Sequence, residues 1–412
     1  MAFLLEGDYM GNKENIRIPV FNHIIESECC GCEACANVCP LKIIKFVQDR
    51  EGFRYPFVDA EECINCKQCV NVCPAINYNE NENIKFMSKS GYIKDENILL
   101  SSSSGGFFSV LVNTFKKIYK DGYISGVVWD EEYNYVYHVL DKGNRINDMV
   151  GSKYIQSRKN FIYNEIKEKL ENGGAVLFVG TGCEVVALKN VLKKDYEKLF
   201  TIDLICKGPC SEKAFVEYIN KIKNKYKSKI KKINMRYIGW KTWIPQWIKI
   251  DFENKKSYKK IFYTTDFGRA FYLMQRKSCS NCHYSGNKRK SDITIGDFHG
   301  ADKNKSYYNP KGVSVMIANN KKGLQLVEHI DYKNVVLEDV DYETIAMHNP
   351  CLIAPVKANE KREEFCDLFI SKGLEVAVKN TYPFKEKMVN HLPPEMAEKL
   401  YRGFNIIRGK KK

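Results

Sequence analysis

The chain has 412 residues, 44% of them hydrophobic, which is enough for two or three domains with a packed core and argues against a disordered chain. No apolar run approaches the roughly 20 residues that a membrane-spanning helix needs, and the first residues lack the basic start of a signal peptide. The net charge of +15 comes from scattered lysines without a nucleic-acid-binding motif, so we expect no nucleic-acid partner and no membrane span.

In chain order, the first strong signal is a pair of C-x2-C-x2-C-x3-C-P motifs between residues 29 and 74. In this pattern three cysteines bind one [4Fe–4S] cluster and the fourth binds the other cluster. The pattern predicts cluster one on Cys29, Cys32, Cys35 and Cys73, and cluster two on Cys63, Cys66, Cys69 and Cys39. Zinc knuckles are the alternative, but zinc has no use for the third cysteine or the trailing Cys-Pro. Cys30 lies outside the pattern, and we expect a packed thiol there rather than a ligand.

The cysteine content also indicates a compartment. Sixteen cysteines in a chain without an export signal favour metal binding in a reducing cytoplasm over disulfide bonds, so we expect a cytoplasmic protein. Clusters of this kind are sensitive to oxygen, which favours an anaerobic or microaerobic cell.

The elements beyond the cysteine motifs alternate between strand and helix patterns. Residues 41–62 predict a β-hairpin between the two motifs. Strands are expected at residues 126–129, 135–140, 175–180, 200–205, 233–238, 247–252, 258–263 and 292–297, and helices at about 101–120, 160–170, from 183 and from 211. This order predicts an α/β (α+β) core with a mixed sheet and a ligand at the strand ends, preceded by a small dicluster domain of the bacterial-ferredoxin type.

Two polar segments are candidate ligand-binding loops. Residues 101–109 form a Ser/Gly-rich turn before a helix, where free backbone N–H groups and the helix dipole favour an anion. Ordinary helix capping by serine is an equally good interpretation. Residues 151–157 carry a cation, an aromatic ring and an amide that could hold a phosphate or the edge of a flavin, although a plain polar loop explains them as well.

Four more cysteines form a third candidate site. Cys183 opens a helix after a buried strand and Cys206 ends the next strand, so parallel pairing of the two strands would bring these thiols together. Cys279 and Cys282, which have two residues between them, can chelate a metal from one loop. Zinc, a [4Fe–4S] cluster and unconnected buried thiols are all open from residue types alone, and Cys210 could compete as a ligand.

A carboxylate and an imidazole follow the last predicted strand. Asp297 and His299 could serve acid/base chemistry at the end of that strand. A capped turn explains the same residues, and it is the interpretation that the sequence favours.

Together these segments resemble the beta-subunit family of coenzyme F420 hydrogenases and dehydrogenases. The resemblance covers about residues 29–319 and rests on Ser104-Gly-Gly-Phe, Gly151-Ser-Lys-Tyr-Ile-Gln-Ser157, Leu177-Phe-Val-Gly-Thr-Gly-Cys183, Asp203-Leu-Ile-Cys206, Lys277-Ser-Cys-Ser-Asn-Cys282 and Ser291-Asp-Ile-Thr-Ile-Gly-Asp-Phe298. This chain differs from the common family pattern in having Gly182 for Pro, Glu184 for Gln and His299 for Trp. These differences bear on the substrate more than on the fold.

The resemblance implies a non-covalent FAD beside a [4Fe–4S] cluster in the α/β core. It implies FAD contacts from Ser102, Ser104, Gly105, Gly106, Ser152, Lys153, Tyr154, Gln156 and Ser157. It also implies a third [4Fe–4S] cluster on Cys183, Cys206, Cys279 and Cys282, which makes zinc the lesser alternative there. The chain then divides into an N-terminal lead (1–22), a 2[4Fe–4S] ferredoxin-like domain (23–80), a linker (81–90), two halves of the FAD-binding beta-subunit domain (91–230 and 231–350) and a helical tail (351–412).

The function expected on this basis is that of an iron–sulfur flavoprotein oxidoreductase. It would pass electrons between the clusters and FAD and exchange hydride with a deazaflavin or another small organic substrate, with ferredoxin or a redox subunit as partner. One alternative is an electron-transfer subunit that has no substrate of its own. Another is a ferredoxin-dependent reductase in cell-surface polysaccharide biosynthesis, and a cluster protein without flavin is the weakest interpretation.

Overall fold

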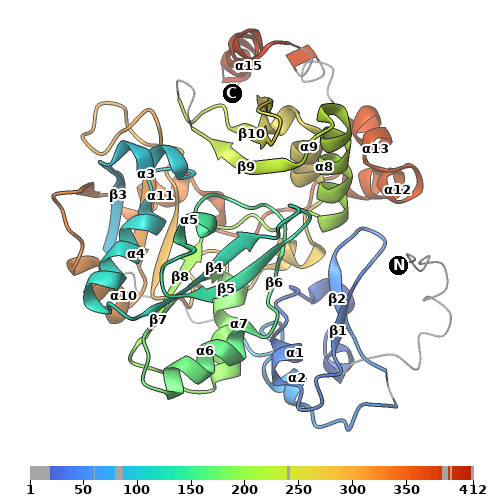
Figure 1. The fold of residues 1–412 in the computed structure, drawn as a ribbon, viewed down its shortest axis with the longest axis vertical. Helices are drawn as coiled ribbons and strands as arrows, with labels where there is room; N and C mark the ends of the chain where they lie inside the picture. The colour runs from blue at the N-terminus through green and yellow to red at the C-terminus, as the bar shows by residue number, and fades with distance from the viewer. Residues whose placement is uncertain are drawn as a thin grey trace.

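A nine-stranded mixed sheet forms the centre of the protein. The computed structural model describes residues 19–59, 61–78, 87–238, 242–382, 388–389 and 392–409. Within this part of the chain the sheet has the order β14-β3-β13-β12-β8-β7-β4-β5-β6 (Figure 1). Its strands are β3 (Met87–Ile93), β4 (Tyr123–Trp129), β5 (Val136–Asp141), β6 (Ser157–Arg158), β7 (Val176–Thr181), β8 (Leu199–Leu204), β12 (Ile293–Asp297), β13 (Ser314–Ala318) and β14 (Val335–Asp339). The predicted α/β core with a mixed sheet is confirmed.

Helices cover both faces of the sheet. In β7, Leu177 and Val179 belong to the cluster packed under α4 (Phe107–Ile118) and α10 (Lys321–Glu328). The alternate residues Val176 and Phe178 belong to the cluster packed under α6 (Ile162–Glu171) and α7 (Gly182–Leu192). Since successive side chains of a strand point to opposite faces, β7 is apolar throughout, which is typical of a parallel strand buried between two helical layers.

A small second sheet lies above the first in Figure 1. It has the order β11-β10-β9 and comprises β9 (Ile230–Tyr237), β10 (Trp247–Phe252) and β11 (Ser257–Ile261). The helices of the upper part of the molecule are α8 (Glu212–Tyr226), α9 (Asp266–Leu273), α12 (Arg362–Lys372), α13 (Leu374–Thr381) and α15 (Pro394–Gly409). The side chains of this sheet and of α8, α9, α12 and α13 share one apolar core, so the predicted helical tail continues the fold.

The N-terminal cysteine module comprises the described residues 19–78 and occupies the lower right of Figure 1. It contains α1 (Ala34–Val38), α2 (Gln68–Asn71) and the antiparallel pair β1 (Lys45–Gln48) and β2 (Arg54–Phe57), which confirms the predicted hairpin. The module is fixed to the core by the bidentate ion pair of Arg362 with Glu51 and by the hydrogen bond from Tyr163 to the Cys32 carbonyl. It is therefore an integral part of the fold.

The remaining short elements complete the description. They are α3 (Glu96–Ser101), α5 (Ile146–Met149), α11 (Tyr342–Met347) and the 3-10 turns η1 (Pro19–Asn22), η2 (Glu26–Glu28), η3 (Phe262–Thr264), η4 (Lys277–Asn281) and η5 (Pro350–Leu352). In the described residues we find no helix with the length and apolar composition of a membrane span.

One segment differs from the expectation. Residues 81–86 of the predicted linker lie outside the described chain, as do residues 1–18 of the predicted lead, but from Met87 onwards the chain forms β3. This strand pairs with β13 and β14 although its sequence is polar. Ser90 is fully buried, and its hydroxyl donates a hydrogen bond to the Ser314 carbonyl at 3.1 Å. Because hydrogen bonds of this kind allow polar side chains to be buried, the strand lacks the apolar pattern by which a buried strand is recognised in a sequence. The other domain boundaries stay predictions.

Candidate functional site

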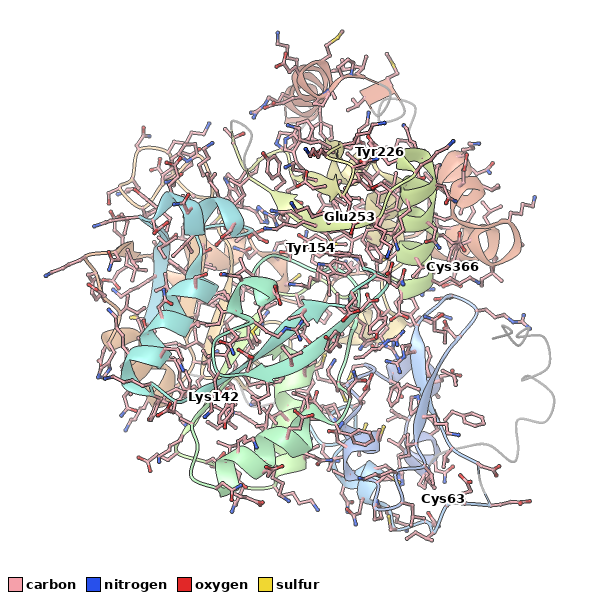
Figure 2. The ribbon with its side chains drawn as sticks, in the orientation of Figure 1. Cys63, Lys142, Tyr154, Tyr226, Glu253 and Cys366 are labelled. Atoms are coloured by element: carbon pink, nitrogen blue, oxygen red, sulfur yellow. The ribbon has the colours of Figure 1, made fainter. Side chains whose placement is uncertain are left out.

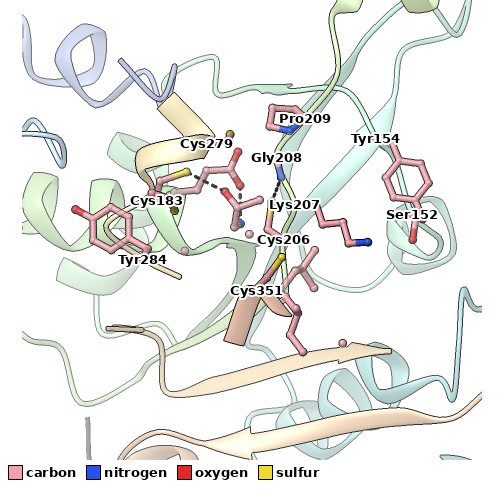
Figure 3. Close-up of a pocket in the computed structure, with 18 of the residues that line it drawn as sticks. Ser152, Tyr154, Cys183, Cys206, Lys207, Gly208, Pro209, Cys279, Tyr284 and Cys351 are labelled. Carbon is pink, nitrogen blue, oxygen red and sulfur yellow. Dashed lines mark hydrogen bonds between the residues drawn. The ribbon is translucent and has the colours of Figure 1, made fainter. Parts of the chain in front are cut away.

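A cavity of about 1110 Å3 lies at the carboxyl ends of β7, β8 and β12 (Figure 3). The segments that follow or end these strands line it, namely residues 179–184, 204–209 and 295–297. β8 pairs in parallel with both β7 and β12, so the carboxyl ends of all three strands meet at one edge of the sheet. Ligand sites of α/β sheets form at this edge, and the sequence predicted the ligand there.

Four thiols form one end of the cavity, and we call them the core thiol set: Cys183, Cys206, Cys279 and Cys282. Cys183 lies in the first turn of α7, Cys206 follows β8, and Cys279 lies in η4; these three are labelled in Figure 3. Burial, and then the neighbouring thiols of the set, raise the pKa of Cys206. The structure thus places the four cysteines that the sequence grouped along the lining of one cavity.

A glycine makes room for this set. Gly208 has a φ of +98°, and a Cβ built on it would lie 2.6 Å from the Cys279 sulfur. Its backbone N–H also donates to the Cys206 sulfur at 3.2 Å.

Among the described residues, no three His, Cys, Asp or Glu side chains are close enough together to bind one metal ion.

The N-terminal cysteine module holds the other predicted ligands in two groups. Burial, and then Cys29 and Cys73, raise the pKa of Cys35. The largest influence on Cys32 is that of the Cys30 thiol, which lowers its pKa, but burial, Cys73 and Cys35 together outweigh it and raise the pKa of Cys32. These four predicted ligands of cluster one are therefore neighbours. The predicted ligands of cluster two surround a small apolar cavity, which is lined by Cys39, Cys63, Cys66 and Cys69. Cys66 is exposed, and Figure 2 shows Cys63 at the outer end of the module.

Cys30 lies between the module and the core. The thiols of Cys183 in the core thiol set and of Cys32 in the first group are both near enough to influence the pKa of Cys30, which is raised. Cys30 packs as the sequence predicted, but nothing in the motif spacing indicated that it links two sets of thiols. One thiol therefore separates the predicted cluster-one site from the core thiol set.

The fold shows whether two further thiols, Cys210 and Cys351, line the cavity. Cys210, weighed as a competing ligand, is fully buried and faces Cys366 and Arg362 outside the cavity. Cys351 lines the cavity near Cys282 and was not singled out from the sequence. It follows α11 at a distance of about 70 residues from the nearest predicted ligand, so only the fold reveals it.

Most of the predicted FAD contacts line the same cavity. The lining includes Ser102, Ser104, Gly106, Ser152, Lys153, Tyr154, Gln156 and Ser157. Gly105 is not among the lining residues, because it lies against the backbone of β3 and β13, where a Cβ would lie 2.4 Å from the Gly91 carbonyl oxygen. The helix predicted from residue 101 begins at Phe107, after a turn in which Gly106 has a φ of +85°. The Ser/Gly turn therefore faces the cavity.

Several of these side chains also have partners within the protein. The Gln156 amide donates to the carbonyls of Cys30 and Gly31 at 2.6 and 2.9 Å and accepts from Arg276 at 2.9 Å. Ser157 donates to Glu184 at 2.9 Å. Lys153 donates to three backbone carbonyls, and burial lowers its pKa to about 7. The 151–157 segment thus helps to hold the cysteine module in place as well as facing the cavity.

A polar cluster forms the other end of the cavity, and we call it the arginine end. Arg236 of β9 donates from Nη1 to Asp297 at 2.7 Å and to the Tyr154 hydroxyl at 3.3 Å. Burial would raise the pKa of Asp297, but Arg236 and His299 hold it below its usual value. The imidazole ring of His299 stacks in parallel on the ring of Trp243, with 5.7 Å between the ring centroids. Burial lowers the pKa of His299. Asp297 and His299, the weak catalytic candidates, therefore belong to a cluster whose central charge is Arg236.

Comparisons with known proteins give two family matches and a similarity to a solved structure. Residues 28–76 match the family model of the 4Fe-4S dicluster domain, and residues 173–343 match that of the C terminus of the coenzyme F420 hydrogenase/dehydrogenase beta subunit. No curated protein sequence matches the chain significantly. A chain of the F420-reducing [NiFe] hydrogenase complex from Methanosarcina barkeri is 16% identical, with a match that covers 74% of this chain and 94% of that chain at a TM-score of 0.45.

The fold and the two family matches define an iron–sulfur electron-transfer protein with an N-terminal dicluster domain. Its core is related to the beta subunits of coenzyme F420 hydrogenases and dehydrogenases, which are oxidoreductase subunits. The resemblance seen in the sequence is confirmed.

Proposed function

We propose that this chain is an iron–sulfur flavoprotein oxidoreductase with three [4Fe–4S] clusters and one FAD. The observation that carries the proposal is the single cavity that has the core thiol set at one end and the arginine end at the other. Such a flavin would convert between one-electron exchange with clusters and two-electron hydride exchange with an organic molecule. Ferredoxin or a redox subunit and a deazaflavin or another small organic molecule are the proposed partners.

The residues present fit these groups. A volume of about 1110 Å3 is slightly larger than the roughly 300–1,000 Å3 typical of cavities that hold small organic ligands. The turn of Ser102, Ser104 and Gly106 offers hydroxyls and a helix N-terminus to a phosphate, and Lys153 and Tyr154 face the same space. The core thiol set supplies four sulfur ligands, which iron–sulfur clusters prefer.

The contact of Cys30 supports an electron route between the module and the core. Cys32 would hold the first cluster and Cys183 the third, and Cys30 lies close to both residues. The role of the chain is to keep these sites adjacent: Gln156 and Arg276 hold the backbone around Cys29, Cys30 and Gly31 against the core. We therefore propose that the exposed second site is the one that meets the external redox partner.

The first test is the composition of protein purified without oxygen. About twelve iron atoms, matching acid-labile sulfide and one released FAD per chain are expected from three four-iron clusters and one flavin. About eight iron atoms with one zinc would show that the core thiol set is structural. Complete clusters without flavin, even after incubation with FAD, would refute the hydride-exchange part of the proposal.

A relay subunit with no substrate of its own is the second candidate, because one feature favours it. Leu41 and Ile64 line the small cavity of the second site and are exposed to 47% and 64%. Exposed apolar side chains around a redox centre are what a docking partner covers. Stable co-purification with a catalytic subunit, together with absence of flavin, would support this function over the flavoenzyme.

A further inference from the structure

Arg236 carries a buried charge with an unused donor. Its side chain is 5% exposed, and Nη1 makes both of the hydrogen bonds described above, to Asp297 and to Tyr154. Among the residues that the structure describes, Nη2 is buried and has no hydrogen-bond partner, although Arg236 lines the cavity. Leaving a buried donor unsatisfied destabilises a protein, and more so for a charged group, so such groups in native proteins normally have a ligand or water as partner.

The surroundings of Nη2 favour an anion. Arg236 lies over the ring of Trp243 at 5.8 Å, and this ring is stacked on His299. Lys207 also lines the cavity, and Figure 3 shows its side chain extending towards Ser152. Arg236 and the Asp297 carboxylate neutralise each other, and no other carboxylate of the described residues pairs with Arg236, so Lys207 leaves an excess of positive charge.

A neighbouring amide adds to the site. In the described part of the chain the Gln246 Oε1 atom is also buried without a hydrogen-bond partner, and Gln246 lines the cavity. Because no described residue forms a hydrogen bond that fixes its orientation, this carboxamide can turn to present its NH2 group as a donor. His299 is 36% exposed, so a ligand at this end can exchange with solvent.

We propose that the arginine end of the cavity binds a carboxylate or phosphate group of the organic substrate. Arg236 Nη2, the Gln246 amide and Lys207 would hold the anion, and the rings of Trp243 and His299 would form the adjacent flat wall. The proposal rests on the proposed function, since it assigns the substrate of the same cavity. It defines the substrate class as an organic anion.

The test compares wild-type protein with Arg236→Lys, both purified without oxygen. A lysine keeps the charge opposite Asp297, but one ammonium cannot replace a fork that serves two partners at once. Calorimetry in chloride-free buffer would measure the Kd of inorganic phosphate and of succinate. We expect Kd of at least one of them to rise at least tenfold in Arg236→Lys and to stay unchanged in the control Arg145→Lys, whose side chain is 37% exposed and pairs with Asp148.

The flavin content of Arg236→Lys shows whether Arg236 binds an anionic group of the substrate or a phosphate of FAD. Wild-type flavin content in Arg236→Lys together with weaker anion binding supports a substrate site. Loss of flavin in that variant would place Arg236 on the phosphates of FAD and overturn the proposal. Equal Kd values in the variant and wild-type protein would overturn it as well.

Wild-type crystals give a measurement that does not depend on the variant folding. After soaking in selenate, an anomalous selenium peak is expected within hydrogen-bonding distance of Arg236 Nη2, and its absence would refute the site. Anion binding through Arg236 in protein that takes up no flavin would refute the proposed function alone. Flavin-loaded protein that binds neither anion would refute this inference alone.

Discussion

The buried ion pair of Lys159 and Glu184 is the most direct test of how the structure is held together beside the core thiol set. The Lys159 side chain is 0% exposed and that of Glu184 is 6% exposed, with 2.5 Å between Nζ and Oε1. Burial alone would raise the pKa of Glu184, but Lys159 and His138 hold it well below its usual value. Replacing Lys159 by Met removes one charge and leaves the other buried.

The expected magnitude follows from this burial. Breaking a buried pair by removing one partner costs about 3–5 kcal/mol, because the remaining charge has lost both water and its partner. The Glu184 carboxylate keeps two other hydrogen bonds, from Ser157 and from the Thr181 backbone, which favour the lower end of that range. In Lys159→Met/Glu184→Gln both charges are gone, so the loss should be much smaller than in the single variant.

The assay is urea unfolding followed by tryptophan fluorescence without oxygen, with iron content measured in the same samples. The matched control is Lys379→Met, which removes an exposed helical pair with Glu375 whose side chains are 70% and 52% exposed. That change should alter stability by less than about 1 kcal/mol. A wild-type urea midpoint for Lys159→Met, with wild-type iron content, would refute the reasoning.

Three further predictions concern pH and iron. Burial raises the pKa of Asp49 from 3.8 to about 6, so the folded state binds its proton more tightly and stability should fall as pH rises from about 4 to about 6. Asp49→Asn should flatten this part of the profile, measured as urea midpoints from pH 4 to 7; an unchanged slope between pH 4 and 6 would contradict the assignment. Cys183→Ser should lose about four iron atoms per chain, whereas Cys210→Ser, a buried thiol outside the cavity, should keep the wild-type iron content. Gly208→Ala adds a Cβ 2.6 Å from the Cys279 sulfur in a left-handed backbone, so it should also lower iron content, and full iron occupancy would show that the set can shift.

The sequence determined the features that depend on short spacing. The cysteine motifs lie within about 50 residues, and a loop that wraps a cluster needs cysteines at fixed short intervals, so the pattern alone predicts two clusters. The buried runs of β7 and β8 likewise predict neighbouring parallel strands, which is why Cys183 and Cys206 could be paired before the fold was known.

Only the tertiary structure decided which distant side chains share one cavity. Arg236, Cys30 and Cys351 come from a strand, a loop and a turn that are separated by more than 100 residues each, and no periodicity connects them. The polar strand β3 enters the sheet because hydrogen bonds to β13 and β14 satisfy it. Spacing along the chain determines which nearby cysteines can bind the same cluster. Long-range packing determines which of these local sites face one another. This packing places the core thiol set and Arg236 in the lining of one cavity.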